Sequence, residues 1–338
     1  MKLTGLLEID SPGVIKNENG EPTGIVKEEA FELAREKFKE TLSLEDYEKF
    51  FEDAMSFAVS QGVTTVGFVS CDEKSIQGLS KLKEKMNFLI RVRVYLDPGR
   101  REVSEKGMYD NKDILESLKK LGAKRGFGDE KLKINGIKIL ADGSLGVRTA
   151  WLSKPYSDEP STSGCPNIDE KTLKELVNEA HEAGLQLVIH GIGDRTIDII
   201  LDAYEDLGDI KDRRHRIEHA SILRKDQIER MTRLGVVASV QPHFVITDWW
   251  AKNRVGDERV KWIYPFKSML EEGVSIGLGT DCPVEILNPW ETVYAAVTRG
   301  KYEDVPYYED TKNECLTLEE ALHAYTLGSA YIMFCLLY

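Results

Sequence analysis

Side chains that can bind metals or carry protons recur at one kind of position in this sequence, the end of a short apolar run. Lys138 and Asp142 fall in "INGIKILAD", His190 ends "LQLVIH", and His219 lies near the end of "HRIEHA". The next two runs end in the same way, with Gln241, His243 and Asp281. Neutral imidazoles are good zinc ligands, and a carboxylate such as Asp281 can bind a metal or accept a proton from its water. The pattern favours a metal site over coincidence.

Lys138 is unusual because it stands among Ile137, Ile139 and Leu140, in a run that is typical of a buried strand. An unpaired buried ammonium is costly, so this lysine should have a partner or be chemically changed. Reaction of its amine with carbon dioxide would give a carbamate, which is a carboxylate-like ligand able to bridge two metals. We therefore predict a carbamate on Lys138.

Each of these residues also has a simpler interpretation. His190 could be a strand-end histidine hydrogen-bonded to a loop, and Asp281 could cap the next helix. His243 is either a substrate contact or a structural residue. Trp249 and Trp250 line a pocket or pack a loop. It is the whole set, rather than any one member, that indicates a metal site.

The remaining histidines are interpreted as structural. His215 and His219 are four residues apart, which in a strand places both on one face, but His215 would lie at the opposite end of the strand. His181 and His323 fall in helical stretches and are expected at the surface or in packing.

The elements that must position these residues alternate between strands and helices. Glycine ends each of three clear helical stretches, "EKTLKELVNEAHEAG", "RTIDIILDAYEDLG" and "KDQIERMTRLG". Such alternation predicts a parallel sheet covered by helices. Seven strands are expected, at 63–70, 90–97, 134–142, 185–190, 215–220, 236–242 and 274–281.

Seven strand–helix units predict an α/β fold, a (β/α)8 TIM-like barrel that is incomplete by one unit. The carboxyl ends of the strands, where the polar residues fall, would form its active face. Residues 1–26 read as a hairpin-like segment with a turn at Asn19-Gly20, and residues 27–338 as one barrel domain. A long helical region is expected at 27–60, ending before Gly62.

Composition limits the function classes. The 338 residues are 41% hydrophobic, which allows a sizeable core. A net charge of −13 argues against nucleic acid and anionic membranes as partners. The five cysteines are scattered without a CxxC pair, and neither a signal peptide nor a membrane-spanning run is recognised, so a reduced cytoplasmic protein is expected.

At the polar strand ends the sequence resembles the amidohydrolase superfamily, and within it the YtcJ-like metal-dependent hydrolases of the amidohydrolase 3 type. The matching segments are "ENGEPTGIVKE", "IKILADGSLGVRTA", "LVIHGIGDRTID", "HRIEHASIL", "VVASVQPHF", "GLGTDCPVEILNPW" and "TLEEALHAYTLGSAYIMF". The resemblance implies a barrel that hydrolyses amide or related C–N bonds with one or two divalent metals, with zinc the first choice. It also implies roles: Lys138 as the carboxylated bridging ligand, His190 and His219 as ligands of one metal, and Asp281 as metal ligand and general base.

The sequence departs from this family at its start. Such enzymes begin with a strand carrying His-x-His, but the first histidine here is His181. The first strand and a small β-sandwich are also absent, so the seven strands correspond to strands two to eight. We expect a chain that is truncated or split relative to the family, with a homo-oligomer or a complementing chain as its partner.

Three functions follow. The first is a metal-dependent hydrolase of a small amide-type substrate, whose pocket would be lined by Asp142, Arg148, Gln241, His243, Trp249 and Trp250. The second is a catalytically inactive barrel that binds one metal or none. The third is an interaction subunit whose open barrel edge accepts a strand that supplies the missing histidines.

Overall fold

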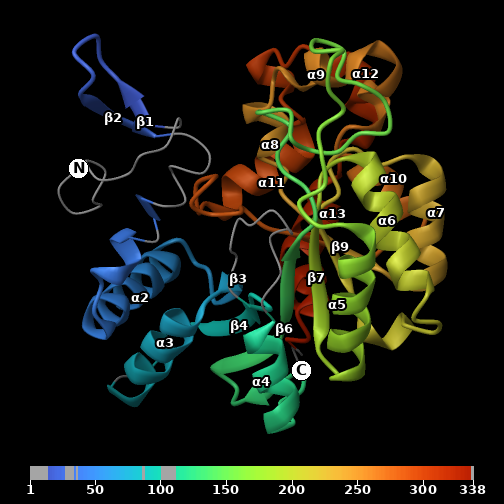
Figure 1. Ribbon diagram of the computed structural model, residues 1–338. Coiled ribbons are helices and arrows are strands. Elements are labelled where there is room, and N and C mark those ends of the chain that lie inside the picture. Colours follow the sequence, from blue (N-terminus) through green and yellow to red (C-terminus); the bar gives the residue numbers. More distant parts are fainter. Residues whose placement is uncertain (1–13, 27–33, 36, 86–87, 100–111, 336–338) are drawn as a thin grey trace. The chain divides into compact units, whose positions relative to one another are not determined.

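The computed structural model of the chain describes residues 14–26, 34–35, 37–85, 88–99 and 112–335 (Figure 1). The chain divides into two compact units. One comprises residues 1–56 and 72–88, and the other residues 57–71 and 89–338. Each is described by itself. The boundary that the sequence suggested after residue 26 stays a prediction.

The first unit contains the predicted hairpin. Strands β1 (Val14–Lys16) and β2 (Pro22–Val26) pair antiparallel. The Asn17 side chain accepts hydrogen bonds from the backbone of Asn19 and Glu21, and Gly20 takes φ +80°. A left-handed residue is what a tight turn needs here, so the turn prediction is confirmed. Residues 1–13 lie outside the described part of the chain.

The first unit also contains helix α3 (Glu73–Lys85) and most of α2 (Leu44–Ser60). Ser43 Oγ accepts from the Asp46 backbone at 3.2 Å, while Asp46 Oδ2 accepts from the Ser43 backbone at 2.8 Å. This reciprocal cap starts a new helix. The long helical region expected over about 27–60 is helical in its described part except at residues 41–43, where the chain breaks, and residues 27–33 lie outside the described part.

The second unit is built on a parallel sheet whose strands follow the order β10-β9-β8-β7-β6-β4-β3. A short strand, β5 (Phe127–Gly128), adds antiparallel to β6. All seven predicted strands are confirmed within a few residues. They are β3 (Thr65–Cys71), β4 (Arg91–Leu96), β6 (Leu132–Leu140), β7 (Gln186–Gly191), β8 (Arg216–His219), β9 (Val237–Val240) and β10 (Ile276–Leu278).

Helices cover one side of this sheet (Figure 1). The amphipathic helices α5 and α6 bury their apolar faces against β7, and α7 packs on α6. The predicted helices are confirmed with their glycine ends, since Gly184, Gly208 and Gly235 all have φ between +72° and +79°. The bounds of these helices and of the one before them are α4 (Asp113–Leu121), α5 (Glu170–Glu182), α6 (Asp194–Glu205) and α7 (Lys225–Leu234).

The second half of the unit adds shorter helices. They are α8 (Phe244–Thr247), α9 (Ala251–Arg259), α10 (Phe266–Glu271), α11 (Pro289–Thr298), α12 (Tyr308–Thr311), α13 (Leu318–His323) and α14 (Ser329–Ile332). No helix within the described ranges is long and apolar enough to cross a membrane.

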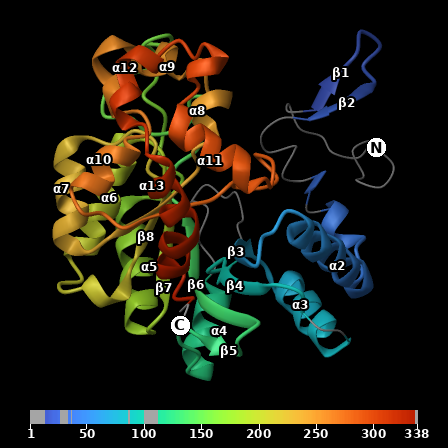
Figure 2. The same cartoon turned by 180° about the vertical axis from the view of Figure 1, so that it is seen from behind.

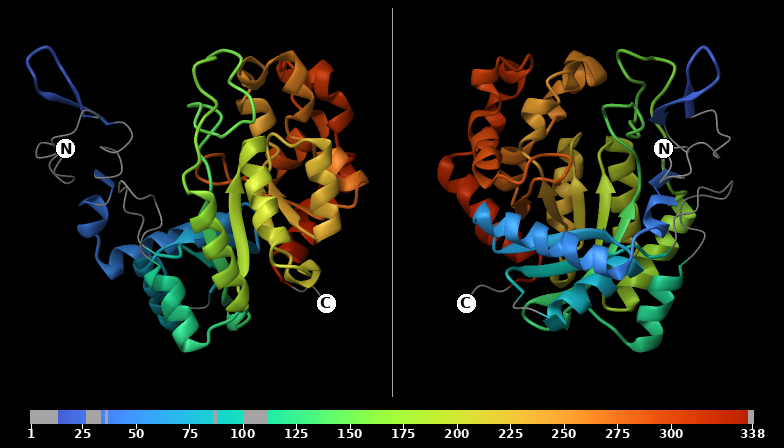
Figure 3. Two further views of the ribbon diagram at one scale, coloured as in Figure 1. Left: turned by 45° about the vertical axis from the view of Figure 1, so that its right-hand side comes forward. Right: turned by 90° about the vertical axis from the view of Figure 1, so that its left-hand side faces the viewer.

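The sheet curls into an incomplete barrel with β3 and β10 at its edges (Figure 3). The C-terminal segment contacts both edge strands, and Figure 2 shows this dark red segment lying across the strands in the view from behind. A side chain at Gly67 on β3 would come within 3.1 Å of Met333 Sδ, and one at Gly277 on β10 would meet Ile332. Residues around Met333 therefore lie where the sheet is open.

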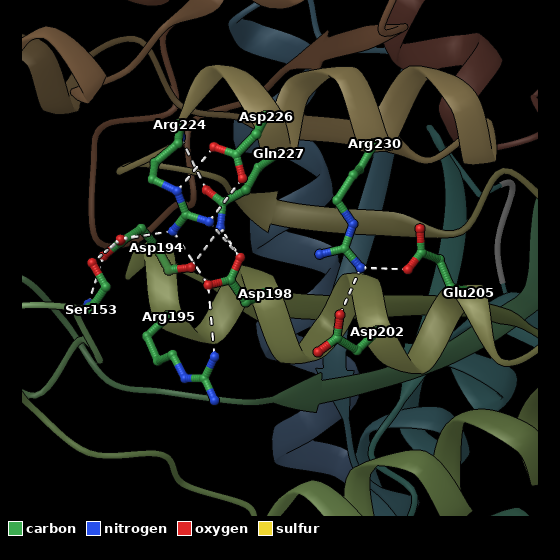
Figure 4. Close-up of polar contacts among 10 residues, drawn as sticks. All are labelled: Ser153, Asp194, Arg195, Asp198, Asp202, Glu205, Arg224, Asp226, Gln227 and Arg230. Carbon is green, nitrogen blue, oxygen red and sulfur yellow. Dashed lines mark hydrogen bonds and ion pairs between the residues drawn. The ribbon is translucent and has the colours of Figure 1, made fainter.

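A network of charges joins α6 to α7 and to the loop before α5 (Figure 4). Arg224 donates to Asp194 at 3.0 Å and to Asp198 at 2.7 Å, and Gln227 donates to both residues. Asp194 is fully buried and also accepts from the Ser153 backbone. The Arg224 guanidinium is thus the counter-charge of a carboxylate that water does not reach.

We expect Arg224→Met to lower the free energy of unfolding by about 3 kcal/mol, because it leaves the Asp194 carboxylate buried without its cation. Urea denaturation followed by circular dichroism measures the loss. Arg233→Met is the matched control, since Arg233 is 64% exposed and its pair with Glu205 should contribute only ~0.5 kcal/mol. Equal losses in the two variants would contradict this account.

Candidate metal centre

The predicted ligands meet at the carboxyl ends of adjacent strands. In the sheet register Leu140 is opposite His190, and Gly191 is opposite His219. Lys138 lies two residues before Leu140 and is only 3% exposed, and His219 is 7% exposed. Parallel strands end at the same edge of a sheet, so β6, β7 and β8 bring a buried amine and two imidazoles together.

The two imidazoles are in contact. Their ring centroids are 4.4 Å apart, with 65° between the ring planes. His190 Nε2 lies 3.0 Å from the carbonyl oxygen of Gly143, which can only accept, so this nitrogen carries the proton. Nδ1 of His190 therefore keeps its lone pair, which is the form that binds a metal.

His219 is held in an unusual state. Its Nδ1 is buried and has no hydrogen-bond partner, and its backbone takes φ +71°. Burial lowers the pKa of His219 well below the usual value, and the charges of His190 and Lys138 act in the same direction. The His219 ring is neutral at pH 7 and is therefore able to act as a ligand.

Lys138 has counter-charges that the sequence interpretation missed. The Glu218 carboxylate is buried on β8 and forms two hydrogen bonds with Arg216, at 2.8 and 2.9 Å. Burial opposes ionisation of Glu218, but the charges of Arg216 and Lys138 hold its pKa below the usual range. The signal was present in the strand "RIEH", where charged residues alternate with an apolar one.

Asp281 follows β10 and has a left-handed backbone, with φ +58°. Burial raises the pKa of its carboxyl, Lys138 and His190 oppose that rise, and Glu218 adds to it. Asp281 therefore shares the electrostatic environment of Lys138 and the imidazole of His190.

These residues are of the types that bind metals, but their arrangement does not form a complete coordination site. Two imidazoles, a carboxylate and an amine are the expected donors, and the orphaned Nδ1 of His219 is a buried ligand atom without a partner. The described ranges contain no group of three or more His, Cys, Asp or Glu side chains that could hold an ion. A carbamate on Lys138 would add a further oxygen donor to this set.

Asp142 anchors the loops beside this site. Its carboxylate accepts from the backbones of Trp151, Ile192 and Gly193, and from Thr196 Oγ1, at 2.8–3.1 Å. Its Oδ1 also lies 3.3 Å from His190 Nε2. Four donors already occupy the oxygens, so Asp142 fixes the loops that follow β6 and β7, and its predicted role in substrate binding stays a prediction.

The other predicted pocket residues fall into separate groups. Arg148 pairs with Asp158, which also binds Arg254, and the Arg254 guanidinium lies 4.9 Å from the ring centroid of Trp250. Gln241 is buried and donates to the backbone of Ser239. Trp249 is 56% exposed.

His243 makes a close pair that the sequence did not predict. Its Nδ1 lies 2.5 Å from Glu285 Oε2, and Thr247 donates to the other oxygen at 2.6 Å. Glu285 follows β10, so this pair stands at the same end of the sheet as Asp281. Nothing in the spacing of 243 and 285 could have linked them, because two separate loops bring them together.

The interpretation of His215 as structural is supported by its contacts. Its Nδ1 accepts from the Leu187 backbone at 3.0 Å, its Nε2 contacts His181 Nδ1 at 3.0 Å, and its ring stacks on Tyr204. Burial, followed by the neighbouring charges, lowers the pKa of His215 to about 3. Its backbone donor lies at the start of β7, at the opposite end of the sheet from His190.

Comparison with known proteins agrees with this geometry. A model of the amidohydrolase family matches residues 4–335. The chain belongs to the amidohydrolase family. A Bacillus subtilis (strain 168) protein named "Putative amidohydrolase YtcJ" is 29% identical over 96% of this chain and 59% of its own. An uncharacterized metal-dependent hydrolase from Pyrococcus horikoshii OT3 has a TM-score of 0.86 and 40% identity, over 99% of this chain and 64% of its own.

The name of a third relative states a substrate class. An N-substituted formamide deformylase of Arthrobacter pascens is 33% identical, over 50% of this chain and 31% of its own. This chain spans about three fifths of the length of the Bacillus subtilis relative. The predictions of the amidohydrolase family and of an incomplete barrel fold are confirmed.

The partly buried carboxyl group of Asp248, which lies near His243, makes the stability of the protein depend on pH. Asp248 accepts a 2.6 Å hydrogen bond from Tyr264. Burial raises the pKa of its carboxyl from 3.8 to about 6, against the effect of the Tyr264 hydrogen bond, and the charge of Glu285 adds to the rise. Because folding raises this pKa, the protein loses stability as pH rises from about 4 through about 6.

We expect Asp248→Asn to gain about 1–2 kcal/mol of stability relative to the parent between about pH 5 and pH 7.5. The neutral amide keeps an acceptor for Tyr264 but never ionises. Urea denaturation at both pH values measures the difference. Asp257→Asn, at a side chain that is 91% exposed, should follow the parent at both values, and a pH-independent difference for Asp248→Asn would contradict the assignment.

Proposed function

We propose that this chain hydrolyses C–N bonds of small non-peptide amides with a divalent metal, zinc in the first instance. The observation that carries the proposal is the contact between the His190 and His219 rings, on strands next to the one that carries the buried amine of Lys138. The relation to an N-substituted formamide deformylase supports N-substituted formamides as the first substrates to test.

Four side chains would hold the metal: His190 through Nδ1, His219, Asp281, and Lys138 as a carbamate. The carbamate forms when the Lys138 nitrogen bonds to the carbon of carbon dioxide and loses a proton. A carbamate beside Glu218 would add a second negative charge, so we expect it to form only together with metal binding. A bound metal would supply a hydroxide at neutral pH and polarise the substrate carbonyl.

Asp281 is proposed as the general base. Its carboxylate would take a proton from the attacking water and pass it to the leaving nitrogen, so that the amine departs neutral. Asp142 would act as a positioning residue, because it holds the Gly143 loop against His190 Nε2. Arg148, Gln241, His243, Trp249 and Trp250 remain proposed substrate contacts.

A second candidate function is an incomplete barrel that binds one metal or none until a further segment completes it. Two observations favour it: β3 and β10 are both edge strands, and the described residues hold no group of three conventional ligands. An exposed sheet edge is a template for another strand. A complementing chain or a second copy of this chain would then supply the missing ligands.

Metal content tests the proposed ligand set. After incubation with zinc and bicarbonate, elemental mass spectrometry of the purified chain should give at least one zinc per chain, and Lys138→Ala should bind less. Lys133→Ala is the control, because Lys133 lies on the same strand but pairs at the surface with Glu130. Absence of zinc from the parent would support the second function. A zinc content that is unchanged in Lys138→Ala would contradict the proposal that a carbamate on Lys138 is a ligand.

Kinetics test the role of Asp281. On a panel of N-substituted formamides, we expect Asp281→Asn to lower kcat by about 10²–10⁴-fold, because proton transfer is lost. Asp257→Asn should leave kcat unchanged. A variant with a raised KM and an unaltered kcat would show that Asp281 binds substrate and is not the base.

A further inference from the structure

Three arginines gather at the end of the sheet opposite the candidate metal centre. Arg125 lies in the loop that leads to β5 and β6, and Arg213 and Arg214 directly precede β8. The backbone of Arg125 donates to the Gly184 carbonyl, just before β7, at 3.1 Å. The Gln186 side chain on β7 donates to the Arg214 carbonyl at 2.5 Å. Three neighbouring strands thus begin beside these guanidinium groups.

Two of the guanidinium groups lie against the same aromatic ring. The central carbon of Arg125 lies 3.6 Å from the ring centroid of Phe334, and that of Arg214 lies 4.4 Å from the same centroid. Burial lowers the pKa of Arg125, and the charges of Arg213 and Arg214 lower it further. The positive charge of Arg213 also lowers the pKa of His181 and His215. Arg213 directly precedes Arg214 in the chain.

These charges are not neutralised within the described part of the chain. None of the three guanidinium groups has a carboxylate within ion-pair distance there, and Arg125 and Arg213 donate no side-chain hydrogen bond. Arg214 uses one donor, at 2.8 Å from the Tyr331 carbonyl. Glu182 raises the pKa of His181 and forms no ion pair with these arginines within the described ranges.

The three arginines differ in this from Arg216, Arg224 and Arg230 of the same unit, which pair with carboxylates. The chain as a whole is acidic, with 58 Asp and Glu against 45 Lys and Arg. Three half-buried cations held together by packing repel one another. A bound anion would remove that repulsion.

We propose that Arg125, Arg213 and Arg214 form an anion-binding site that takes a phosphoryl group. The guanidinium fork matches the oxygens of phosphate, and three forks offer donors from several directions. A group carrying close to two negative charges balances three cations better than a single carboxylate does. Phe334 already lies against the guanidinium groups of Arg125 and Arg214. Its ring therefore orients these arginines and is not available to stack on the base of a nucleotide.

The test is isothermal titration of the full chain with inorganic pyrophosphate at pH 7.5 and low ionic strength. We expect one site, and at least a tenfold weaker Kd for Arg125→Gln/Arg213→Gln. The control is Arg195→Gln/Arg233→Gln, which removes the same charge at exposed positions and should bind as the parent does. Arg213→Gln alone is the second variant, because Arg213 makes no side-chain hydrogen bond in the described chain and its loss should not unfold the protein.

Each outcome decides the proposal. Binding that persists in Arg125→Gln/Arg213→Gln would place pyrophosphate elsewhere, for example at the metal centre, and would overturn it. Absence of binding in the parent, or an equal loss in the control, would also overturn it. Citrate binding as tightly as pyrophosphate would show that the site does not select phosphoryl groups. Equal binding of pyrophosphate and ATP would support recognition of the phosphoryl group alone, and tighter ATP binding that needs the same arginines would assign the site to nucleotides.

Discussion

The bidentate ion pair between Arg216 and Glu218 is the interaction on which the polar interior of the sheet depends. Both residues are buried on β8. Arg216 also donates to the Tyr95 hydroxyl at 3.2 Å, and that hydroxyl donates to Gln186 Oε1 at 3.0 Å, so three strands share one network. A buried pair of this kind contributes little net stability, but removal of one partner is costly. The Glu218 carboxylate of this pair also interacts electrostatically with the buried Lys138.

The side chains of the short segment from Arg213 to His219 lie in three different environments. Arg213 and Arg214 remain in the loop among other cations, whereas His215 packs on Tyr204 and His181. Arg216 and Glu218 share one face of the strand, and His219 turns away through its left-handed backbone to meet His190. Side chains two residues apart in a strand lie on the same face, which places Arg216 and Glu218 together. The positive φ of His219 then turns its imidazole away from these charged groups.

The sequence was a good guide to everything that depends on periodicity. The seven strands, the three glycine-ended helices and the hairpin turn follow from local patterns, and the structure has them. The resemblance to amidohydrolases, not spacing alone, assigned the roles of Lys138, His190, His219 and Asp281. The proximity of Glu218 to Lys138 and the His243–Glu285 pair were missed because tertiary contacts bring these residues together. The break at Ser43 was missed because a reciprocal cap can start a helix inside a sequence with good helix formers on both sides.

The C-terminal segment that lies against both edge strands has a consequence for how the protein is made. Cys335 Sγ lies 3.6 Å from Arg93 Nη2, a contact between residues 242 positions apart, and Asn135 donates to the Met333 carbonyl at 2.6 Å. During synthesis β3 and β4 leave the ribosome long before the residues that cover them. The edge of the sheet stays exposed through most of translation, and contacts of such sequence separation form slowly. Until the C-terminal segment is made, the uncovered strands are therefore open to pairing with other chains.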